Sequence, residues 1–155
     1  MLTFRREVAV PHAAPGVFDY LADFTTVDEW DPRATGTHRL SGDGGQGSYH
    51  ECDVESLGRS IPMGYTTTRV EQGADGGDRI EWVGSSRLVR AHDVIRLRRS
   101  EDGRGVVVDY TMRVTFERAP RTWDTVLRPA VRRLCDDAQD GMRHTLTARF
   151  SRVAA

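Results

Sequence analysis

The period of the apolar residues changes once along this chain, close to residue 120, and that change restricts the folds open to it. Before it, short segments alternate apolar and polar residues, and turns rich in glycine and aspartate separate them. After it, apolar residues recur every three or four positions from Arg121 to Phe150. Alternation is typical of strands that are exposed on one face, and a spacing of three or four residues is typical of an amphipathic helix. The sequence predicts antiparallel hairpins followed by one long helix, with Pro129 either kinking that helix or marking its true start.

Strands are predicted at residues 2–10, 34–41, 48–57, 63–72, 79–85, 88–100 and 106–117, with a glycine-rich turn at 73–78. A helical segment over residues 12–24 and a short helix or turn over 25–30 follow the first strand. Pro32 disfavours helical geometry at Asp31, so the chain is expected to turn extended there. Strands grouped apart from helices indicate an α+β fold, in which the apolar face of an antiparallel sheet packs on the long helix.

Composition excludes several classes of function. A chain of 155 residues is expected to form one domain, spanning residues 1–155, that can bury a sizeable core. Its net charge of -1 gives no case for nucleic acid as a partner, and no apolar run is long enough for stable membrane insertion. The N-terminus lacks the apolar stretch of a secretory signal, and two distant cysteines favour reduced thiols, so we expect a cytoplasmic protein. Lysine is absent, which excludes Schiff-base chemistry on a lysine side chain.

The segment "PHAAPGVFDYLADFTTVDEWDP" resembles the START-like (SRPBCC) superfamily, in the branch of polyketide cyclases/dehydrases and lipid-transport proteins. Members often carry A-P-x-x-V-(F/W)-x-x-(L/I)-x-D and then a tryptophan; the matching residues here are Ala14, Pro15, either Val17 or Phe18, Leu21, Asp23 and Trp30. The resemblance covers nearly the whole chain. It implies the helix-grip fold, a curved sheet of about six to seven strands wrapped on the terminal helix around a cavity. It also implies that Trp30 lies at the rim of the cavity as an apolar plug after the helix ends, with Glu29 and Asp31 facing water. It also implies aromatic polyketide cyclases, lipid or hormone binders and co-chaperone-like stress proteins as the candidate functions, and it requires no cofactor.

Strand parity selects the candidate catalytic residues. Tyr110 falls on the apolar, inward face of the last strand, and Asp93 on the inward face of the strand before it, unless a β-bulge or strand end returns Asp93 to water. His50 shares an inward face with Cys52, where it contacts either a ligand or a backbone carbonyl. In a cyclase, His50, Asp93 and Tyr110 would be base, orienting carboxylate and acid. His50 and Cys52 have only His92 and Asp93 as further candidate ligands, so no metal site is predicted.

Residues 63–72 allow two parities. The favoured one places Val70 inward with Thr66 and Thr68; the other places Met63, Tyr65 and Arg69 inward, where a guanidinium could hold an enolate oxygen. Residues expected to contact a ligand, counting both parities, are Trp30, Cys52, Tyr65, Arg69, Trp82, Met112, Leu134, Ala138 and Met142.

Two functions from different classes remain open. One is a polyketide cyclase/dehydrase that performs aldol-type cyclisation and dehydration. The other is a non-catalytic carrier of a lipid or another hydrophobic ligand, with a co-chaperone-like partner-binding protein as a third reading. We expect a hydrophobic small molecule or polyketide intermediate as partner, and a monomer or homodimer. An acyl carrier protein could dock on Arg87, Arg90, Arg96, Arg98 and Arg99. The favoured alternative is that these side chains pair with Glu51, Asp53 and Glu55 on a neighbouring part of the same outer face.

Overall fold

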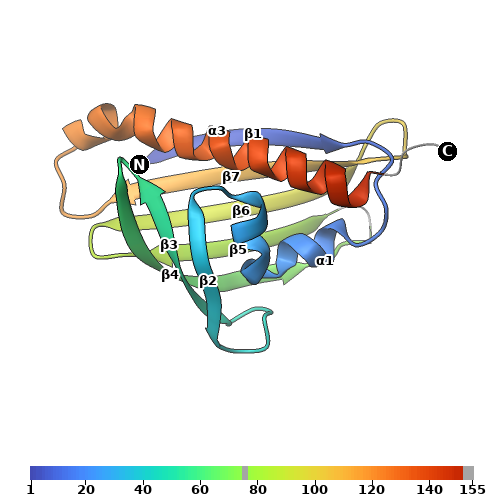
Figure 1. The fold of residues 1–155 in the computed structure, drawn as a ribbon, viewed down its shortest axis with the longest axis horizontal. Coiled ribbons are helices and arrows are strands. Elements are labelled where there is room, and N and C mark those ends of the chain that lie inside the picture. The colour runs from blue at the N-terminus through green and yellow to red at the C-terminus, as the bar shows by residue number, and fades with distance from the viewer. Residues whose placement is uncertain (75–76, 152–155) are drawn as a thin grey trace.

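The computed structural model describes residues 1–74 and 77–151, so the middle of the predicted turn at 73–78 and the last four residues of the predicted domain lie outside it. The elements, in chain order, are β1 (Leu2–Val10), α1 (Val17–Ala22), the 3₁₀ turn η1 (Phe24–Thr26), α2 (Val27–Trp30), β2 (Ala34–Ser41), β3 (Tyr49–Ser56), β4 (Arg59–Glu71), β5 (Asp78–Ser85), β6 (Val89–Arg99), β7 (Val106–Phe116) and α3 (Thr122–Phe150). Figure 1 shows them. The order confirms the predicted α+β fold.

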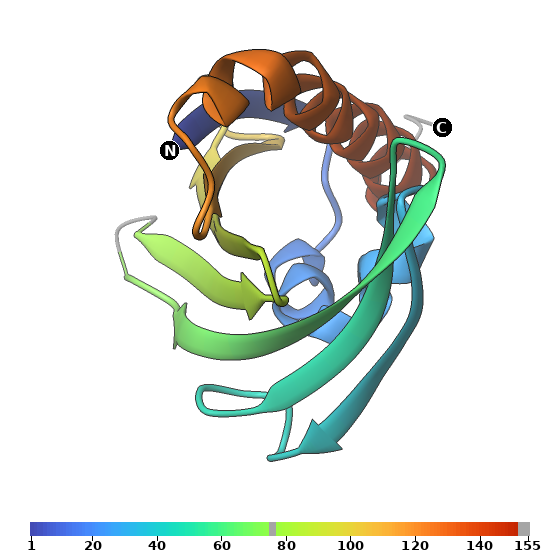
Figure 2. The ribbon, with the colours of Figure 1, turned by 90° about the vertical axis from the view of Figure 1, so that its left-hand side faces the viewer.

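The seven strands form one antiparallel sheet in the order β1-β7-β6-β5-β4-β3-β2. Consecutive strands from β2 to β7 pair as neighbours, and the first strand closes the row by pairing with the last. In Figure 2 the sheet curls around beneath α3, which covers its concave side. This is the helix-grip arrangement, with the apolar face of the sheet turned towards the helix.

The first helix is shorter than predicted. Gly16 has φ 110°, a left-handed conformation that glycine adopts without strain, and α1 begins only after it at Val17. Before Gly16, Ala13 forms an isolated antiparallel bridge with Ser151 at the end of α3. Pro15 therefore lies in the connection between β1 and α1, close to the end of α3, rather than in the first helical turn.

A β-bulge in β4 reconciles the two parities of this strand. Met63 and Tyr65 are buried, and the register slips between Thr67 and Arg69, so that Val70 again packs against the core opposite Ile80. The preference for inward Thr66 and Thr68 was wrong: Thr68 is exposed and Thr66 is only half-buried. Arg69 is also not inward, because its guanidinium lies 3.4 Å from Glu71 and 3.7 Å from Glu81 at the surface.

The strand also starts earlier than predicted, at Arg59, and includes Pro62. Proline lacks the N–H that a central strand must donate. At this point β4 pairs with β3 alone, since its pairing with β5 begins only at Gly64. Pro62 is thus tolerated because β4 is locally an edge strand.

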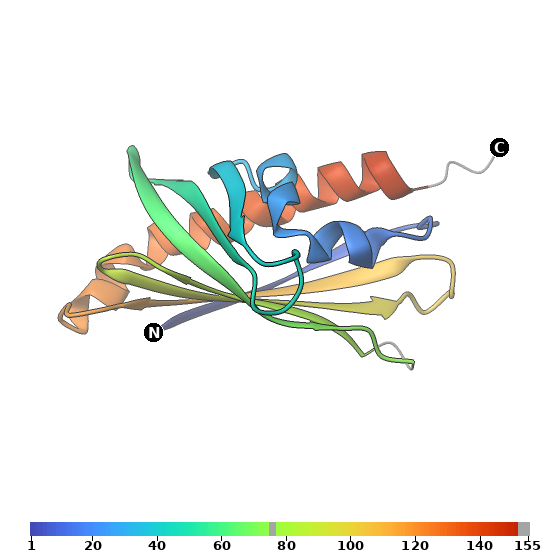
Figure 3. The ribbon, with the colours of Figure 1, turned by 90° about the horizontal axis from the view of Figure 1, so that it is seen from below.

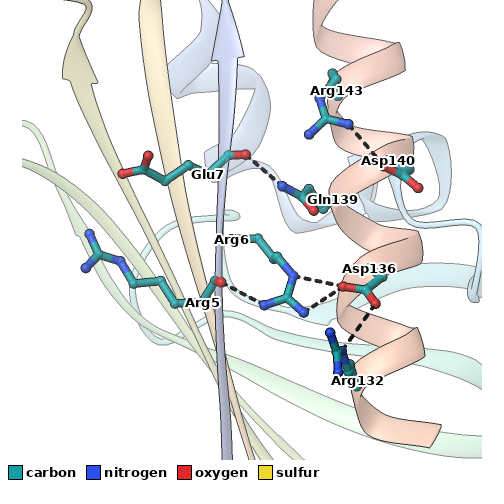
Figure 4. Close-up of polar contacts among 8 residues, drawn as sticks. All are labelled: Arg5, Arg6, Glu7, Arg132, Asp136, Gln139, Asp140 and Arg143. Atoms are coloured by element: carbon teal, nitrogen blue, oxygen red, sulfur yellow. Dashed lines mark hydrogen bonds and ion pairs between the residues drawn. The ribbon is translucent and has the colours of Figure 1, made fainter. Parts of the chain in front are cut away.

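Helix α3 is fixed along β1 by polar contacts on its outer side. Figure 4 shows Arg6 of β1 reaching Asp136, with N–O distances of 2.6 and 2.8 Å, and the Gln139 amide donating to the Glu7 carbonyl at 2.9 Å. The opposite face of α3 supplies the buried side chains Val131, Cys135, Ala138, Met142 and Leu146. The helix is continuous through Pro129, which therefore does not mark its start.

The short helices pack beside the C-terminal half of α3 (Figure 1 and Figure 3). Thr145 donates to the backbone carbonyl of Glu29 at 3.0 Å, and Arg149 pairs with the Glu29 carboxylate at 2.5 Å. Gly141 stands where α3 comes closest to α2, and a Cβ atom there would overlap the backbone oxygen of Trp30. Trp30 itself is 3% exposed, so the end of α2 is a packed corner of the core.

The arginines of β6 do not pair as predicted with the acids of β3. Strands β4 and β5 separate β3 from β6, which places the two groups too far apart for cross-strand contacts. Arg98 instead lies 3.5 Å from Glu7, and Arg90 3.1 Å from Glu117. Within residues 1–74 and 77–151, none of the helices combines the length and apolarity that crossing a bilayer requires.

Candidate functional site

A cavity of about 310 Å³ lies between the concave face of the sheet and α3. Its walls are mostly apolar and come from the short helices, from β2 to β7 and from the N-terminal half of α3. This size falls at the lower end of small-molecule sites, whose volumes run from roughly 300 to 1,000 Å³. The few polar groups in the wall therefore determine what the cavity can recognise or transform.

The structure brings most of the predicted site residues to this cavity. Those that line it are Trp30, Cys52, Tyr65, Trp82, Asp93, Tyr110, Met112 and Leu134. The others lie elsewhere: Arg69 at the outer surface, Ala138 and Met142 fully buried in the face of α3 that packs on the sheet, and His50 behind the cavity wall.

Asp93 and Tyr110 form the most distinctive contact in the cavity. They stand on adjacent strands, in a continuous register that pairs Asp93 with Met112 and Ile95 with Tyr110, so no bulge returns Asp93 to water. The Tyr110 hydroxyl donates to Asp93 Oδ1 at 3.0 Å, and the two side chains are buried. Burial raises the pKa of Asp93 to about 7, with the Tyr110 hydrogen bond opposing the shift and the charge of Asp31 adding to it. Near neutral pH this carboxyl can both accept and donate a proton.

Asp31 is the functional candidate that the sequence did not reveal. It was expected to face water, yet it lines the cavity beside Trp30. Burial raises its pKa to about 6, while the backbone N–H of Arg33, 2.9 Å from Oδ1, stabilises the charged form. Pro32 predicted the extended backbone at Asp31, and the structure confirms it (φ -103°, ψ 106°). No sequence pattern indicated that the Asp31 side chain would face the cavity.

Two tryptophans that line the cavity, Trp30 and Trp82, carry buried indole N–H groups. Trp30 Nε1 and Trp82 Nε1 are buried, and neither has a hydrogen-bond partner among the described residues. A buried donor without an acceptor costs about 1–3 kcal/mol, so an oxygen acceptor on a guest that reached either nitrogen would be stabilising.

His50 is fully buried on β3, but Phe24 of η1 packs on it with ring centroids 5.0 Å apart, and Phe24 rather than His50 lines the cavity. Neither of its ring nitrogens has a partner among the described residues. Burial lowers its pKa, so the imidazole is neutral at pH 7. His50 and Cys52 share a buried face, but among residues 1–74 and 77–151 no group of three or more His, Cys, Asp or Glu side chains is placed to hold a metal ion.

Comparison with known proteins now identifies the family. Residues 1–147 match the sequence profile of the family described as polyketide cyclase/dehydrase and lipid transport. The chain belongs to this polyketide cyclase/dehydrase family. Among curated proteins, no sequence matches the chain.

Solved structures share the family fold at low sequence identity. The Zhui aromatase/cyclase of Streptomyces sp. R1128 superposes with a TM-score of 0.76 at 15% identity, over 96% of this chain and 94% of that one. A START superfamily protein of Mycobacterium smegmatis gives a TM-score of 0.69 at 16% identity, over 94% and 99%. Such identities establish the helix-grip fold alone. Family and fold together point to a polyketide cyclase/dehydrase-like or START-type hydrophobic ligand-binding protein.

The raised pKa of Asp93 in the cavity predicts that the stability of the protein depends on pH. The folded protein retains a proton up to about pH 7 that an unfolded aspartate releases near its ordinary value of 3.8. The favourable contribution is complete below that ordinary value and is lost as the pH rises through the folded value. We expect the free energy of unfolding, measured with urea, to fall as the pH rises from the ordinary value of 3.8 to about 7 and to level off above that. In Asp93→Asn, which cannot ionise, the fall should be smaller; an equal fall in both proteins would contradict the shift.

Proposed function

We propose that the cavity binds a largely apolar, carbonyl-bearing small molecule, and that Asp93 moves protons on it in aldol-type cyclisation and dehydration. The observation that carries the proposal is the buried Asp93–Tyr110 pair, joined at 3.0 Å in an otherwise apolar cavity. A carboxyl costs free energy to bury, and a cavity that only holds a hydrocarbon gains nothing from it. A pKa of about 7, by contrast, suits a group that takes and returns a proton near neutral pH.

In the proposed reaction, the Asp93 carboxylate removes a proton from a methylene carbon between two carbonyl groups. The electron pair left on that carbon forms the new C–C bond to a ketone carbon of the same chain, and the ketone oxygen takes the proton from Asp93 to become a hydroxyl. Loss of a second proton from the ring and of this hydroxyl, which leaves as water, completes dehydration. Tyr110 orients Asp93 and stabilises its charged form, since its hydrogen bond lowers the pKa of the carboxyl.

The other groups have supporting roles in this proposal. The indole N–H groups of Trp30 and Trp82 would donate to carbonyl oxygens of the folded substrate, including the oxygen on which enolate charge develops. Asp31, whose pKa is raised to about 6, supplies a second proton-exchanging group in the same wall. His50 takes no direct role, because Phe24 covers it on the cavity side.

The acceptor preference can be tested with two flat molecules of the same outline. We expect anthraquinone, which has two carbonyl oxygens, to bind about tenfold more tightly than anthracene, because only the quinone satisfies the unpaired donors. Quenching of the fluorescence of the cavity tryptophans measures both affinities. Replacing Trp30 by Phe should reduce the preference while retaining the apolar wall.

Native mass spectrometry of the purified protein, with extraction of any bound molecule, separates catalysis from carriage. A retained oxygenated polycyclic or polyketide-like molecule would support the proposal. Equal affinity for anthracene and anthraquinone, together with a retained fatty acid, would contradict it and favour lipid carriage. A protein that binds neither probe nor any lipid would exclude both and favour a partner-binding role.

A further inference from the structure

A second hollow adjoins the cavity between the β3–β4 turn and the N-terminal half of α3. This outer groove, of about 650 Å³, has walls from Leu57 and Gly58 of the turn and, on the helix, from Val126, Leu127, Pro129, Ala130, Arg133 and Leu134. Residues that line both the cavity and the outer groove are Ser56, Leu57, Leu127, Ala130 and Leu134. A ligand longer than the cavity would therefore emerge into the outer groove rather than directly into bulk water.

The outer groove is amphipathic. Leu57 and Val126 are 70% and 72% exposed, although both are strongly apolar. Leu88 and Trp123, 47% and 43% exposed, continue this apolar surface at the cavity mouth. Clustered apolar side chains left in water mark a binding surface more often than isolated ones do.

Two arginines, Arg33 and Arg133, give the outer groove its charge. Arg133 stands four residues before Asp137 on α3, the spacing at which a helical ion pair is expected. Asp137 is instead bound by Arg33 from the start of β2, with Nε–Oδ2 and Nη2–Oδ2 distances of 2.7 and 2.6 Å. Among the described residues, Arg133 consequently has no acidic side chain within ion-pair distance.

Arg132, the preceding residue on α3, differs from Arg133 in having an acidic partner. Arg132 lies 4.0 Å from its own i+4 partner, Asp136, on the side of the helix that faces β1 (Figure 4). At the cavity mouth, Arg59 also has no ion pair among the described residues. Arg59 and Arg133 thus leave positive charge at the cavity mouth and in the outer groove without an acidic partner among the described residues.

We propose that the outer groove binds the anionic end, carboxylate or phosphate, of an elongated ligand whose apolar body occupies the cavity, with Arg133 as the principal contact. The inference rests on the proposed function only in requiring that the cavity hold an apolar body. The anion would lie between Arg133 and Arg33, and its linker would follow Leu127 and Ala130, which both hollows share. Burial of exposed Leu57 and Val126 against that linker would add hydrophobic free energy.

The test uses three probes with one ring system: anthraquinone-2-carboxylate, its neutral carboxamide, and the phosphate monoester of 2-(hydroxymethyl)anthraquinone. We expect the wild type to bind the two anions more tightly than the amide, by about fivefold for a charge-assisted contact at a half-exposed site. Arg133→Ala should abolish that preference without changing the affinity for the amide. Arg132→Ala, the matched control one residue away, should keep it. Whether the carboxylate or the phosphate gains more decides which anion the outer groove prefers.

The outcomes separate this inference from the proposed function. If the amide and the anions bind equally and Arg133→Ala changes neither, the cavity function stands and the outer groove is not an anion site. If Arg132→Ala and Arg133→Ala weaken the anions alike, the effect is general electrostatic attraction and the inference is wrong. If no probe binds to any of the three proteins, the proposed function itself fails. A preference that raised salt reduces and Arg133→Ala removes would support the inference.

Discussion

Replacing Gly141 by alanine is expected to destabilise the protein by about 2–3 kcal/mol, the cost of forcing an extra methyl group into a packed contact. The sign of this change in the free energy of unfolding is informative, because replacing glycine by alanine in a helix interior ordinarily stabilises a protein by roughly 0.5–1 kcal/mol. Here the added Cβ would overlap the backbone oxygen of Trp30 and would lie 3.0 Å from Pro32 Cδ and 3.1 Å from the Trp30 carbonyl carbon. Backbone and a proline ring cannot rotate away as a flexible side chain can.

Urea unfolding at one fixed pH measures this difference. Asp140→Ala is the matched control, because Asp140 is the preceding residue, is exposed, and makes only a surface ion pair with Arg143 at 3.1 Å. That variant should lie within about 0.5 kcal/mol of the wild type. Increased stability in Gly141→Ala would show that α2 and α3 separate at little cost, and would contradict the packed corner described above.

The same substitution should also weaken ligand binding. Trp30 lines the cavity, and the contact with Gly141 fixes the end of α2 that carries it. The end of α2, where Glu29 and Asp31 flank Trp30, thus has two roles. Its backbone packs against Gly141 of α3, and the side chains of Trp30 and Asp31 form part of the cavity wall.

The fold could be predicted because local signals agreed with one another. Alternation in β6 and β7 gave the correct inward faces for Asp93 and Tyr110, and the apolar spacing of α3 gave its buried face. These signals depend on period alone, which a sequence displays directly. Alternation failed at the centre of β4, because the bulge between Thr67 and Arg69 changes the parity within one strand, and nothing in "TTTRV" marks its position.

The site was less predictable because it depends on contacts between distant segments. Strand parity placed His50 inward, which it is, but could not show that Phe24, 26 positions earlier, covers it on the cavity side. Asp31 follows a helix end and precedes a proline, a context usually exposed to solvent, and only the packed structure shows that it lines the cavity. The absence of an ion pair at Arg133, among the described residues, could likewise not be predicted, because it depends on the binding of Asp137 by the distant Arg33.

Replacing Asp93 by asparagine is expected to lower the rate of cyclisation about 10²- to 10⁴-fold, the usual contribution of a positioned acid–base group. Asparagine preserves the size of the side chain and can still accept the Tyr110 hydrogen bond, but it cannot take the methylene proton. A poly-β-ketone thioester mimic serves as substrate, and product formation followed by its ultraviolet absorbance gives kcat/KM. In the wild type, kcat/KM should rise with pH through a pKa of about 7, since the carboxylate is the active form.

The second member of the pair sharpens this prediction, because Tyr110→Phe should move the pH profile as well as slow the reaction. The Tyr110 hydrogen bond lowers the pKa of Asp93, so its removal should shift the rising limb to higher pH. Asp109→Asn is the matched control: Asp109 is the adjacent buried carboxylate of β7, on the opposite face of the sheet, where it is bound by Arg5. It should cost stability and leave the pH profile of kcat/KM in place. An Asp93→Asn protein that is folded and as active as the wild type would exclude Asp93 as the base and leave the cavity with a binding role alone.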